Sequence, residues 1–339
     1  MKYFIGIDGG GSQTKAVVID DTLQVLGRGV AGPSNHYVLG PERAALNCEQ
    51  AALSALADAT RLAHGLTHDD IAAWGFGLAG VRREGDAASM RVYLGPLVNG
   101  RPWVLDTDAA VALSGAFAGG PGIVLSAGTG SIAYGQDEQG DRFYADGWGP
   151  LLGDEGSGYW IGMEALRAVC RHADGRGPQT RLAAPIFNAL NIRDCDELVQ
   201  AIHAASSHPK HLTREQIARL TQVVFDTANS GAQVAGDIRE RAVKHLGNAV
   251  AAVARAVLTR HRERDMIQPI APLEIGVALR GGLFEDDFFR ASVGYNIGER
   301  MVEMKRDYLP LASWRIVRPQ FDAAVGAALL AQKEVFQTA

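Results

Sequence analysis

Two glycine-rich turns that carry hydroxyl side chains are the segments of this sequence best suited to hold phosphate. The second turn occupies residues 126–131 and contains Gly128 and Thr129. The first follows Asp8 and contains, in order, Gly9, Gly10, Gly11, Ser12, Thr14 and Lys15. Glycines let backbone N–H groups converge on phosphate oxygens, and the serine and threonine hydroxyls add donors. Because each turn follows an apolar strand, the pair predicts that the phosphate tail of a nucleotide is held from two sides.

Asp8 ends the strand before the first turn, which is a suitable place for a carboxylate that holds Mg²⁺. Mg²⁺ keeps much of its hydration shell, so we expect this contact to run through water. The turn is not a Walker A loop, because GxxxxGK[ST] is missing and a strand rather than a helix follows. A plain glycine β-turn is the alternative interpretation.

Two carboxylates, Asp106 and Asp108, lie at the junction of a predicted strand and a predicted helix. In phosphoryl transfer the protein mainly positions groups, and one carboxylate orients or deprotonates the attacking hydroxyl. Two side chains that are two residues apart on a strand share a face. Asp108 would also suit the N-cap of the helix. Spacing alone therefore leaves both residues as candidates for the base.

Residues 147–160 combine glycines, an acidic pair and a tryptophan just before a predicted helix. The carboxylates of Asp154 and Glu155 could accept hydrogen bonds from sugar hydroxyls. Trp148, between Gly147 and Gly149, could offer an apolar face to a pyranose ring. Acids that complement the dipole at a helix start are the alternative. That alternative explains the acids but not the glycines or the tryptophan.

The elements that must position these segments alternate between strands and helices, which indicates an α/β fold. The strands are predicted at 3–8, 15–20, 24–30, 72–78, 103–106, 122–126, 132–135, 143–145 and 273–279. The helices are predicted at 41–65, 109–117, 159–170, 236–259 and 321–335. In the first helix, the apolar spacing predicts one buried face formed by Leu46, Leu53, Leu56 and Ala63. A strand, a glycine turn and a hairpin open each half, which indicates two related domains that share a cleft.

Length and composition agree with two domains and exclude several functions. A chain of 339 residues is long for one core, and 47 % apolar with 21 % charged residues is typical of a globular protein. A net charge of −5 without a basic block argues against nucleic-acid or anionic-membrane surfaces. No apolar stretch or signal-type segment indicates a membrane span. The cysteines, which form no CxxC pair, favour a reduced, cytoplasmic protein: Cys48, Cys170 and Cys195.

As an ordered series, these segments resemble the N-acetylglucosamine and glucosamine kinase branch of the BadF/BadG-type ATPases, in the actin–Hsp70–sugar-kinase superfamily. The resemblance spans nearly the whole chain and is carried by DGGGSQTK (8–15), GPSNHYVLG (32–40), DTDAA (106–110), SAGTGS (126–131), GWGPLLGDEGSGYWIG (147–162), AGD (235–237), ALRGGLF (278–284) and PQFDAAVGAAL (319–329). It implies two ribonuclease H-like, actin-like ATPase domains with a nucleotide cleft between them. The expected domains are 1–117 and 118–319, the second with a helical insertion, and the C-terminal helix at about 320–337 is expected to pack back on the first.

The resemblance also implies an activity and roles for single residues. The activity is the transfer of phosphate from Mg²⁺-bound ATP to the 6-hydroxyl of N-acetylglucosamine, with Asp108 as base. Gly236, Gly281 and Gly282 match positions near the adenosine. The sugar would be held by Asn35, Gly147, Trp148, Gly149 and Asp154. A homodimer is the assembly that the family suggests.

Two alternatives to this activity are open. The C-terminal segment WRIVRPQFDAAVGAAL also resembles bacterial glucosamine kinases, so glucosamine is the second candidate substrate. Some BadF/BadG relatives are ATPase activators that use a cysteine-bound iron–sulfur cluster. Cys170 and Cys195 lie in the second half but belong to no cluster motif, which argues against that role.

Overall fold

The chain divides into two compact units. The computed structural model describes residues 1–63, 65–205, 208–209, 211–267, 271, 273–308 and 312–337. The first unit comprises residues 1–124, 134–142 and 317–339, and the second comprises 125–133 and 143–316.

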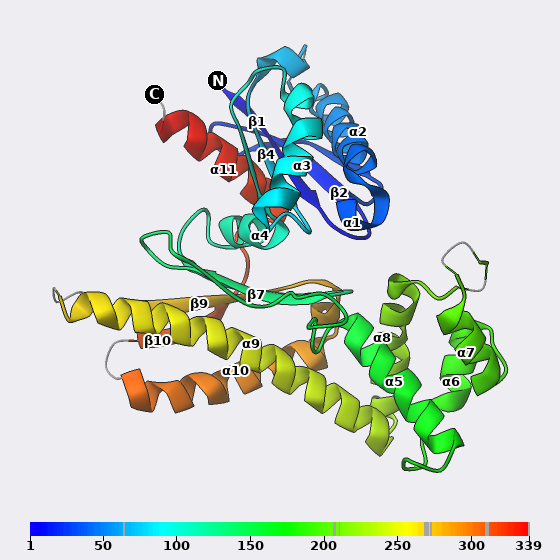
Figure 1. Cartoon of the computed structure of the whole chain (residues 1–339). Helices are drawn as coiled ribbons and strands as arrows, with labels where there is room; N and C mark the ends of the chain where they lie inside the picture. The colour runs from blue at the N-terminus through cyan, green and yellow to red at the C-terminus, as the bar shows by residue number, and fades with distance from the viewer. Residues whose placement is uncertain are drawn as a thin grey trace. The chain divides into compact units, whose positions relative to one another are not determined.

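The first unit is built on a five-stranded sheet with the order β3-β2-β1-β4-β5 (Figure 1). Its strands are β1 Tyr3–Gly9, β2 Thr14–Asp20, β3 Val25–Ala31, β4 Ile71–Leu78 and β5 Trp103–Thr107. The first three strands form antiparallel hairpins, whereas β1, β4 and β5 run parallel. The carboxyl ends of the three parallel strands therefore meet at one edge of the sheet.

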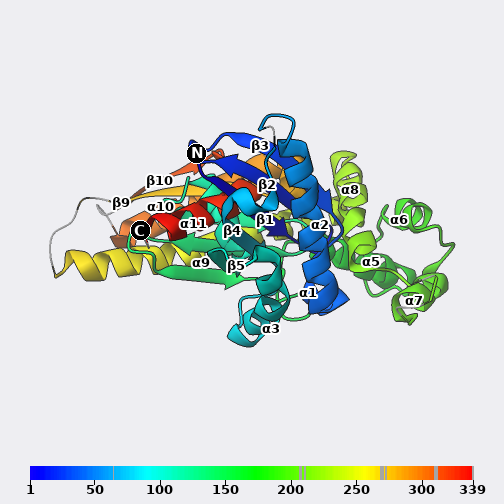
Figure 2. The same ribbon diagram turned by 90° about the horizontal axis from the view of Figure 1, so that it is seen from above.

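Helices cover both faces of this sheet. They are α1 His36–Leu39, α2 Pro41–Ala59, α3 Glu84–Leu94, α4 Asp108–Ala116 and α11 Ala323–Gln337, with three-residue and four-residue 3-10 turns at His68–Asp70 and Gly95–Val98. Ile5 and Ile7 pack with α2, while Phe4 packs with α11. Figures 1 and 2 show α2 and α11 on opposite sides of β1 and β4.

The predicted buried face of α2 is wrong in part: Leu56 is buried, but two of the other predicted residues are not. Leu46 and Leu53 are 41 % and 52 % exposed, and the helix ends at Ala59, before Gly65. The residues of α2 that face the core are mostly alanines. The physical reason lies in β3, where a Cβ on Gly27 would come within 2.3 Å of the Ala55 carbonyl oxygen. Helix and strand backbones approach so closely that leucines would not fit between them.

The C-terminal helix approaches the sheet in the same way. A Cβ on Gly75 of β4 would lie 1.9 Å from the Ala327 carbonyl oxygen. A Cβ on Gly326 of α11 would lie 1.9 Å from the Val111 carbonyl oxygen of α4. Since backbone atoms cannot yield, small residues are required at these positions to seat α11 against both β4 and α4.

The second sheet has the order β10-β9-β6-β7-β8 and lies mostly in the second unit, although residues 122–124, 134–136, 142 and 317 of its strands are assigned to the first. Its strands are β6 Gly122–Ala127, β7 Ser131–Gln136, β8 Arg142–Asp146, β9 Leu273–Arg280 and β10 Ala312–Val317. The helices of the second unit are α5 Gly158–Ala173, α6 Ala183–Leu190, α7 Cys195–His203, α8 Arg214–Asn229, α9 Gln233–Asp265 and α10 Asp287–Tyr308, with a 3-10 turn at Gly282–Glu285. Helix α9 is longer at both ends than predicted, and it lies beside α10 (Figure 1).

The two sheets share one strand order. If the second sheet is written from its other edge, β8-β7-β6-β9-β10 corresponds strand for strand to β3-β2-β1-β4-β5. The repeated form predicted from the sequence is thereby confirmed. In each sheet the glycine turn follows the central strand, β1 or β6, and leads into its neighbour.

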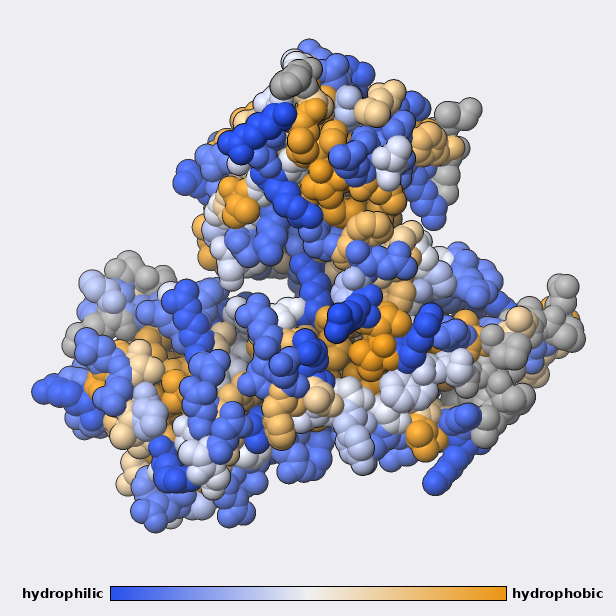
Figure 3. All heavy atoms as spheres, turned by 180° about the vertical axis from the view of Figure 1, so that it is seen from behind, coloured by the Kyte–Doolittle hydropathy of each residue, from blue (hydrophilic) through white to orange (hydrophobic). Residues whose placement is uncertain are grey.

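The surface agrees with the ordinary composition of the chain. Hydrophilic residues cover much of the face drawn in Figure 3, and apolar residues occur there in separate patches. Within the described ranges, no helix has the length and apolar character needed to cross a membrane.

Gly75→Ala should destabilise the first unit, because the new methyl group would meet the Ala327 carbonyl oxygen at 1.9 Å. Overpacking of this kind costs about 1–3 kcal/mol. Gly85→Ala is the matched control, since a Cβ on Gly85 in α3 meets no atom within 4 Å. Its free energy of unfolding should stay unchanged or rise by up to about 1 kcal/mol. Urea denaturation measures both variants, and equal stability of the two would contradict the close seating of α11.

Candidate functional site

Charged side chains form a row across the carboxyl edge of the first sheet. Lys15 of β2 pairs in register with Asp8 of β1, Asp8 with Gly77 of β4, and Gly77 with Asp106 of β5. Register partners point to the same face of a sheet. The backbones of Asp8 and Asp106 are two strands apart, about 10 Å, and Gly77 places no side chain between them. The side chain of Val111 from α4 packs on Gly77 instead, since a Cβ on Gly77 would come within 2.0 Å of it. The row therefore places one carboxylate on each side of this contact and a lysine at one end.

The first glycine turn projects beyond this row. The Gly10 N–H donates to the Gln13 carbonyl oxygen at 3.1 Å, which closes the turn. Gly11 and Ser12 at its tip are exposed, as is Lys15 where β2 begins. The exposed backbone N–H groups and the Ser12 hydroxyl are the parts of the predicted phosphate motif that a ligand could reach.

Thr14 has a task different from the predicted one. The residue is completely buried, and its hydroxyl lies 2.7 Å from the Gly32 carbonyl oxygen and 2.9 Å from Ser34 Oγ. The Ser34 N–H donates to the Gly10 carbonyl oxygen at 3.0 Å. The hydroxyl of Thr14 thus ties the loop 32–34 to the glycine turn. The prediction that it donates to phosphate is corrected, because its hydrogen is directed into the protein.

Asn35 follows that loop and occupies the N-cap of α1. Its side-chain oxygen accepts a hydrogen bond from the Tyr37 N–H at 3.0 Å. The Tyr37 hydroxyl in turn donates to Asp86 at 2.5 Å, and this bond holds the pKa of Asp86 below its ordinary value. His36 Nε2 lies 3.5 Å from the other Asp86 oxygen. Asn35 is therefore fixed in orientation by the helix that it caps.

The junction of β5 and α4 separates the two candidate bases. The strand ends at Thr107, whose side chain caps α4 by accepting from the Ala110 N–H at 3.1 Å. Asp108 is the first residue of the helix and accepts from the Ala109 N–H at 2.9 Å. Two expectations are corrected here. Asp108 is not the N-cap, and it does not share a strand face with Asp106, because the chain turns into the helix between them.

Asp106 is held by an arginine that sequence reasoning missed. Arg142, which belongs to the same unit, donates to both carboxylate oxygens of Asp106, at 3.1 and 2.7 Å. The Asp106 side chain is only 9 % exposed, and it also accepts from the Thr107 N–H at 2.7 Å. A forked, charge-assisted pair of this kind fixes both geometry and charge. No local pattern around Arg142 announces this pairing, since the partners are 36 residues apart.

The second glycine turn is bound to the start of α5. The Gly128 N–H donates to the Gly130 carbonyl oxygen at 2.9 Å. The carbonyl oxygens of Gly128 and Thr129 accept from the N–H groups of Gly158 and Tyr159, at 2.8 and 3.2 Å. The first two residues of α5 thus fix the path of the turn.

Asp146 anchors the loop that contains Trp148, and it too was missed. Its carboxylate accepts from the N–H groups of Asp154 and Glu155, at 2.7 and 2.8 Å, and from the Ser131 hydroxyl at 3.2 Å. Asp146 therefore joins the second glycine turn to residues 147–155. Its position directly before Gly147-Trp148 in the sequence is the signal that could have indicated it.

Asp154 makes a second connection between the same segments. It is 6 % exposed, and its two carboxylate oxygens accept from the Ser131 N–H at 3.3 Å and from Arg214 at 3.1 Å. Burial raises the pKa of Asp154 above its ordinary value. Asp146 and Asp154 both have left-handed backbone, with φ of 66° and 55°, a strained state that tends to occur at functional sites. Contact of Asp154 with a sugar stays a prediction.

The predicted sugar and adenosine positions are placed as follows. Trp148 is 58 % exposed between Gly147 and Gly149, both with positive φ. Gly281 lies against the second turn, because a Cβ there would come within 2.2 Å of the Ala127 carbonyl oxygen. Gly236 lies in the first turn of α9 and Gly282 begins a 3-10 turn, and both have open space on the side of a Cβ.

Metal-ligand side chains do not cluster in the described part of the chain. No group of three or more His, Cys, Asp or Glu residues is placed there to hold a metal ion.

Comparisons with known proteins agree on one family. The sequence pattern of the BadF/BadG/BcrA/BcrD ATPase family matches residues 5–331. The chain is 28 % identical over 334 residues to the N-acetylmuramic acid/N-acetylglucosamine kinase of Clostridium acetobutylicum, covering 98 % of this chain and 99 % of the relative. It is 31 % identical over 243 residues to the N-acetyl-D-glucosamine kinase of Dictyostelium discoideum, covering 69 % and 73 %.

Solved structures confirm the predicted fold class, two ribonuclease H-like, actin-like ATPase domains. A Chromobacterium violaceum protein of 27 % identity superposes with a TM-score of 0.68 over 97 % of this chain and 99 % of that chain. The ROK hexokinase of Thermus thermophilus, 19 % identical, superposes with a TM-score of 0.54 over 98 % and 99 %. With the family pattern matching residues 5–331, this chain belongs to the BadF/BadG/BcrA/BcrD ATPase family.

Proposed function

We propose that the chain is an ATP-dependent amino sugar kinase that phosphorylates the 6-hydroxyl of N-acetylglucosamine. The observation that carries the proposal is the junction of β5 and α4, where Arg142 holds Asp106 and Asp108 opens a helix at the edge that also bears Asp8. Kinases of N-acetylglucosamine align over most or nearly all of this chain, which supports the same activity here.

Asp108 is the base in this proposal. It is the first residue of α4, where the helix dipole favours an ionised carboxylate. Phosphoryl transfer has a loose transition state, so the base serves mainly to orient the sugar hydroxyl and to take its proton. Asp106 is a positioning residue, because the Arg142 fork occupies both of its oxygens.

The two glycine turns hold the phosphates of ATP. The first turn contributes Gly9, Gly10 and Gly11 and the Ser12 hydroxyl, with the Gly10 N–H closing the turn and the Lys15 ammonium beside Asp8 in the row. The second turn contributes Gly128 and Thr129. Gly236, Gly281 and Gly282 are assigned to the adenosine. Donors fixed before the reaction stabilise the charge that spreads over the moving phosphoryl group.

The residues around Asp8 fit a nucleotide-bound Mg²⁺. The cation needs only one or two protein carboxylates, because water and phosphate oxygens complete its shell. Asp8 is nearly buried at the end of β1, and the exposed tip of the first glycine turn, to which the phosphates are assigned, follows it in the chain. Asp8 would hold Mg²⁺ through water, and the ion would neutralise charge on the phosphates.

The sugar is assigned to Asn35 and to the loop with Gly147, Trp148, Gly149 and Asp154. The contact of a Glu155 carboxylate oxygen with His245 Nδ1, at 3.0 Å, supports the acetamido sugar over glucosamine. Glucosamine is a cation, and Glu155 is the carboxylate that could have met its ammonium group. Since Glu155 already pairs with His245, a neutral acetamido group suits the site better.

A cytoplasmic location and a homodimer complete the proposal. The three cysteines are free thiols, which supports a reducing compartment. The homodimer rests on the family resemblance.

Asp108→Asn should lower kcat by about two to four orders of magnitude, with KM for both substrates nearly unchanged, because it removes the base and keeps the shape. An ADP-release assay with N-acetylglucosamine measures this effect. Asp106→Asn is the comparison and should reduce stability as well as rate, since one N–H group would face Arg142. Normal turnover in Asp108→Asn with lost turnover in Asp106→Asn would reverse the assignment.

Ser12→Ala and Thr14→Val should affect different properties, although both remove one hydroxyl from the first turn. Ser12→Ala should raise KM for ATP about fivefold, the effect of a lost hydrogen bond of roughly 1 kcal/mol, and leave the free energy of unfolding unchanged. Thr14→Val should lower the free energy of unfolding by about 1–3 kcal/mol, because it leaves the Gly32 carbonyl oxygen without its partner. Titration with ATP and urea denaturation of each variant would show the reverse pattern if Thr14 were the phosphate donor.

N-acetylglucosamine should have the higher kcat/KM when it and glucosamine are measured at one ATP concentration. A site that hydrogen-bonds one group of its substrate discriminates strongly against a sugar that lacks this group, but only weakly against a sugar with an extra group. The kcat/KM values of the two sugars should therefore differ clearly. N-acetylmuramic acid belongs in the same panel. A tenfold preference for glucosamine, about 1.4 kcal/mol of transition-state binding, would overturn the choice of sugar and leave the kinase proposal standing.

A further inference from the structure

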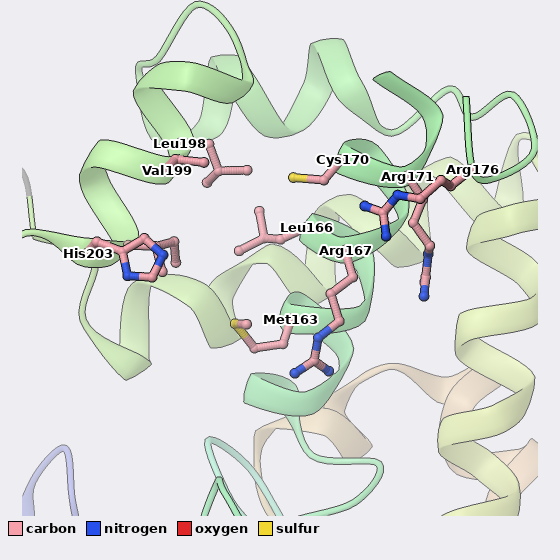
Figure 4. A pocket seen from close by; sticks show the side chains of 10 residues that line it. Met163, Leu166, Arg167, Cys170, Arg171, Arg176, Leu198, Val199 and His203 are labelled. Carbon is pink, nitrogen blue, oxygen red and sulfur yellow. The ribbon is translucent and has the colours of Figure 1, made fainter. Parts of the chain in front are cut away.

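A cavity of about 390 Å³ lies between α5 and α7 in the second unit (Figure 4). Its floor is apolar and includes Met163 and Leu166 from α5 and Leu198 and Ile202 from α7. Leu166 and Leu198 are nearly fully buried, so the floor is continuous with the packed interior. The volume lies in the range of small-molecule sites in proteins.

The rim of this cavity is positively charged. Arg167, Arg171 and Arg176 line it together with His203, and none of the described residues that line it is a carboxylate. Figure 4 shows the arginines on the α5 side and His203 on the α7 side. Such a combination of guanidinium groups above an apolar floor differs from an ordinary solvated helix face, where charges of both signs alternate.

The carboxylates near the rim do not balance these charges. Arg176 donates from Nε and Nη2 to one oxygen of Asp174, at 2.9 and 2.6 Å, and Arg167 pairs with Glu164 at 2.8 Å. Glu164 also pairs with Arg241 at 2.8 Å, so one carboxylate serves two guanidinium groups. In the part of the chain that the structure describes, Arg171 forms no ion pair with a carboxylate. The rim therefore keeps an excess of positive charge.

A helix C-terminus attracts cations, and this effect accounts for one of the positive charges on the rim. Arg171 lies in the last turn of α5, where it complements the helix dipole. The dipole does not require the neighbouring Arg176 or an apolar hollow beneath both. The hollow, the charge excess and the forked donors together match a ligand with one strongly anionic group and one apolar part.

We propose that this cavity binds a small phosphate monoester, with the phosphate held by Arg171 and by the N–H donors of Arg176 that Asp174 does not use, and the apolar part resting on the floor. Guanidinium forks match phosphate oxygens in pairs, which makes arginine the preferred phosphate ligand. The site is separate from the glycine turns in function, because it uses the far end of α5 from Gly158 and Tyr159, which bind the second turn.

Cys170 supplies a local reporter, since it lines the cavity and is partly exposed. Alkylation by iodoacetamide, followed by peptide mass spectrometry, gives the rate at this single thiol. Cys48 is an internal control, because burial raises its pKa to about 12 and thiolates are the reactive form. The probes are AMP, N-acetylglucosamine 6-phosphate and inorganic phosphate.

AMP or N-acetylglucosamine 6-phosphate should slow alkylation of Cys170 about tenfold at ten times its Kd, by mass action. The double variant Arg171→Gln, Arg176→Gln should lose this protection. Arg193→Gln should keep it, because Arg193 pairs with Glu197 and does not line the cavity.

Three outcomes would overturn the proposal. The first is that neither ester protects Cys170 at concentrations up to 10 mM, a range that covers weak sites with a Kd of about 1 mM. The second is that protection persists in the double arginine variant, which would place the effect at another site. The third is that inorganic phosphate protects as well as the esters, which would exclude a role for the apolar floor. The readout does not depend on catalysis, so failure here leaves the kinase proposal untouched.

Discussion

The first unit depends on the contact of backbone with backbone between α11, α4 and the sheet. Gly326 of α11 lies against the Val111 carbonyl oxygen, and the Ser114 hydroxyl donates to the Gly326 carbonyl oxygen at 2.9 Å. Just before α11, the Phe321 N–H donates to the Gly115 carbonyl oxygen at 3.0 Å. Each of these contacts fixes the position of α4, the helix that begins with Asp108. The position of the base proposed here, Asp108, therefore depends on main-chain packing rather than on flexible side chains, which favours precise placement.

The second unit secures its candidate site by hydrogen bonds instead of close packing. Asp146 and Asp154 both have left-handed, strained backbone. Their carboxylates accept hydrogen bonds from backbone N–H groups of the second glycine turn and of the loop 147–155. Charge-assisted bonds to N–H groups offset the cost of the strained backbone. The result is a loop whose base is fixed while Trp148 at its tip remains exposed.

Much of this arrangement could be predicted because it depends on residues that are close together in the sequence. Glycines after apolar strands predicted both turns, and their recurrence predicted two sheets of one topology. The strand boundaries were close because turn residues mark them. The junction of strand and helix indicated both Asp106 and Asp108 as candidate bases, and only the family resemblance favours Asp108.

What could not be predicted depends on partners distant in sequence. The Arg142–Asp106 fork joins two strand ends that no local rule connects. The buried face of α2 was misassigned because leucine periodicity normally marks a core, whereas here strand glycines admit only alanines. Thr14 looks like a phosphate donor by composition, and only the position of Gly32 reveals that its hydroxyl is already used.

The place of α11 in the chain has a consequence for biosynthesis. The face of β1 and β4 that bears Phe4 and Gly75 is completed by residues 323–337. Residues 143–316 of the second unit are made before that helix. Domains generally fold as units during synthesis, so the first unit must wait with an apolar face uncovered while the second is made. In the nascent chain this apolar face therefore stays exposed until residues 323–337 have been synthesised.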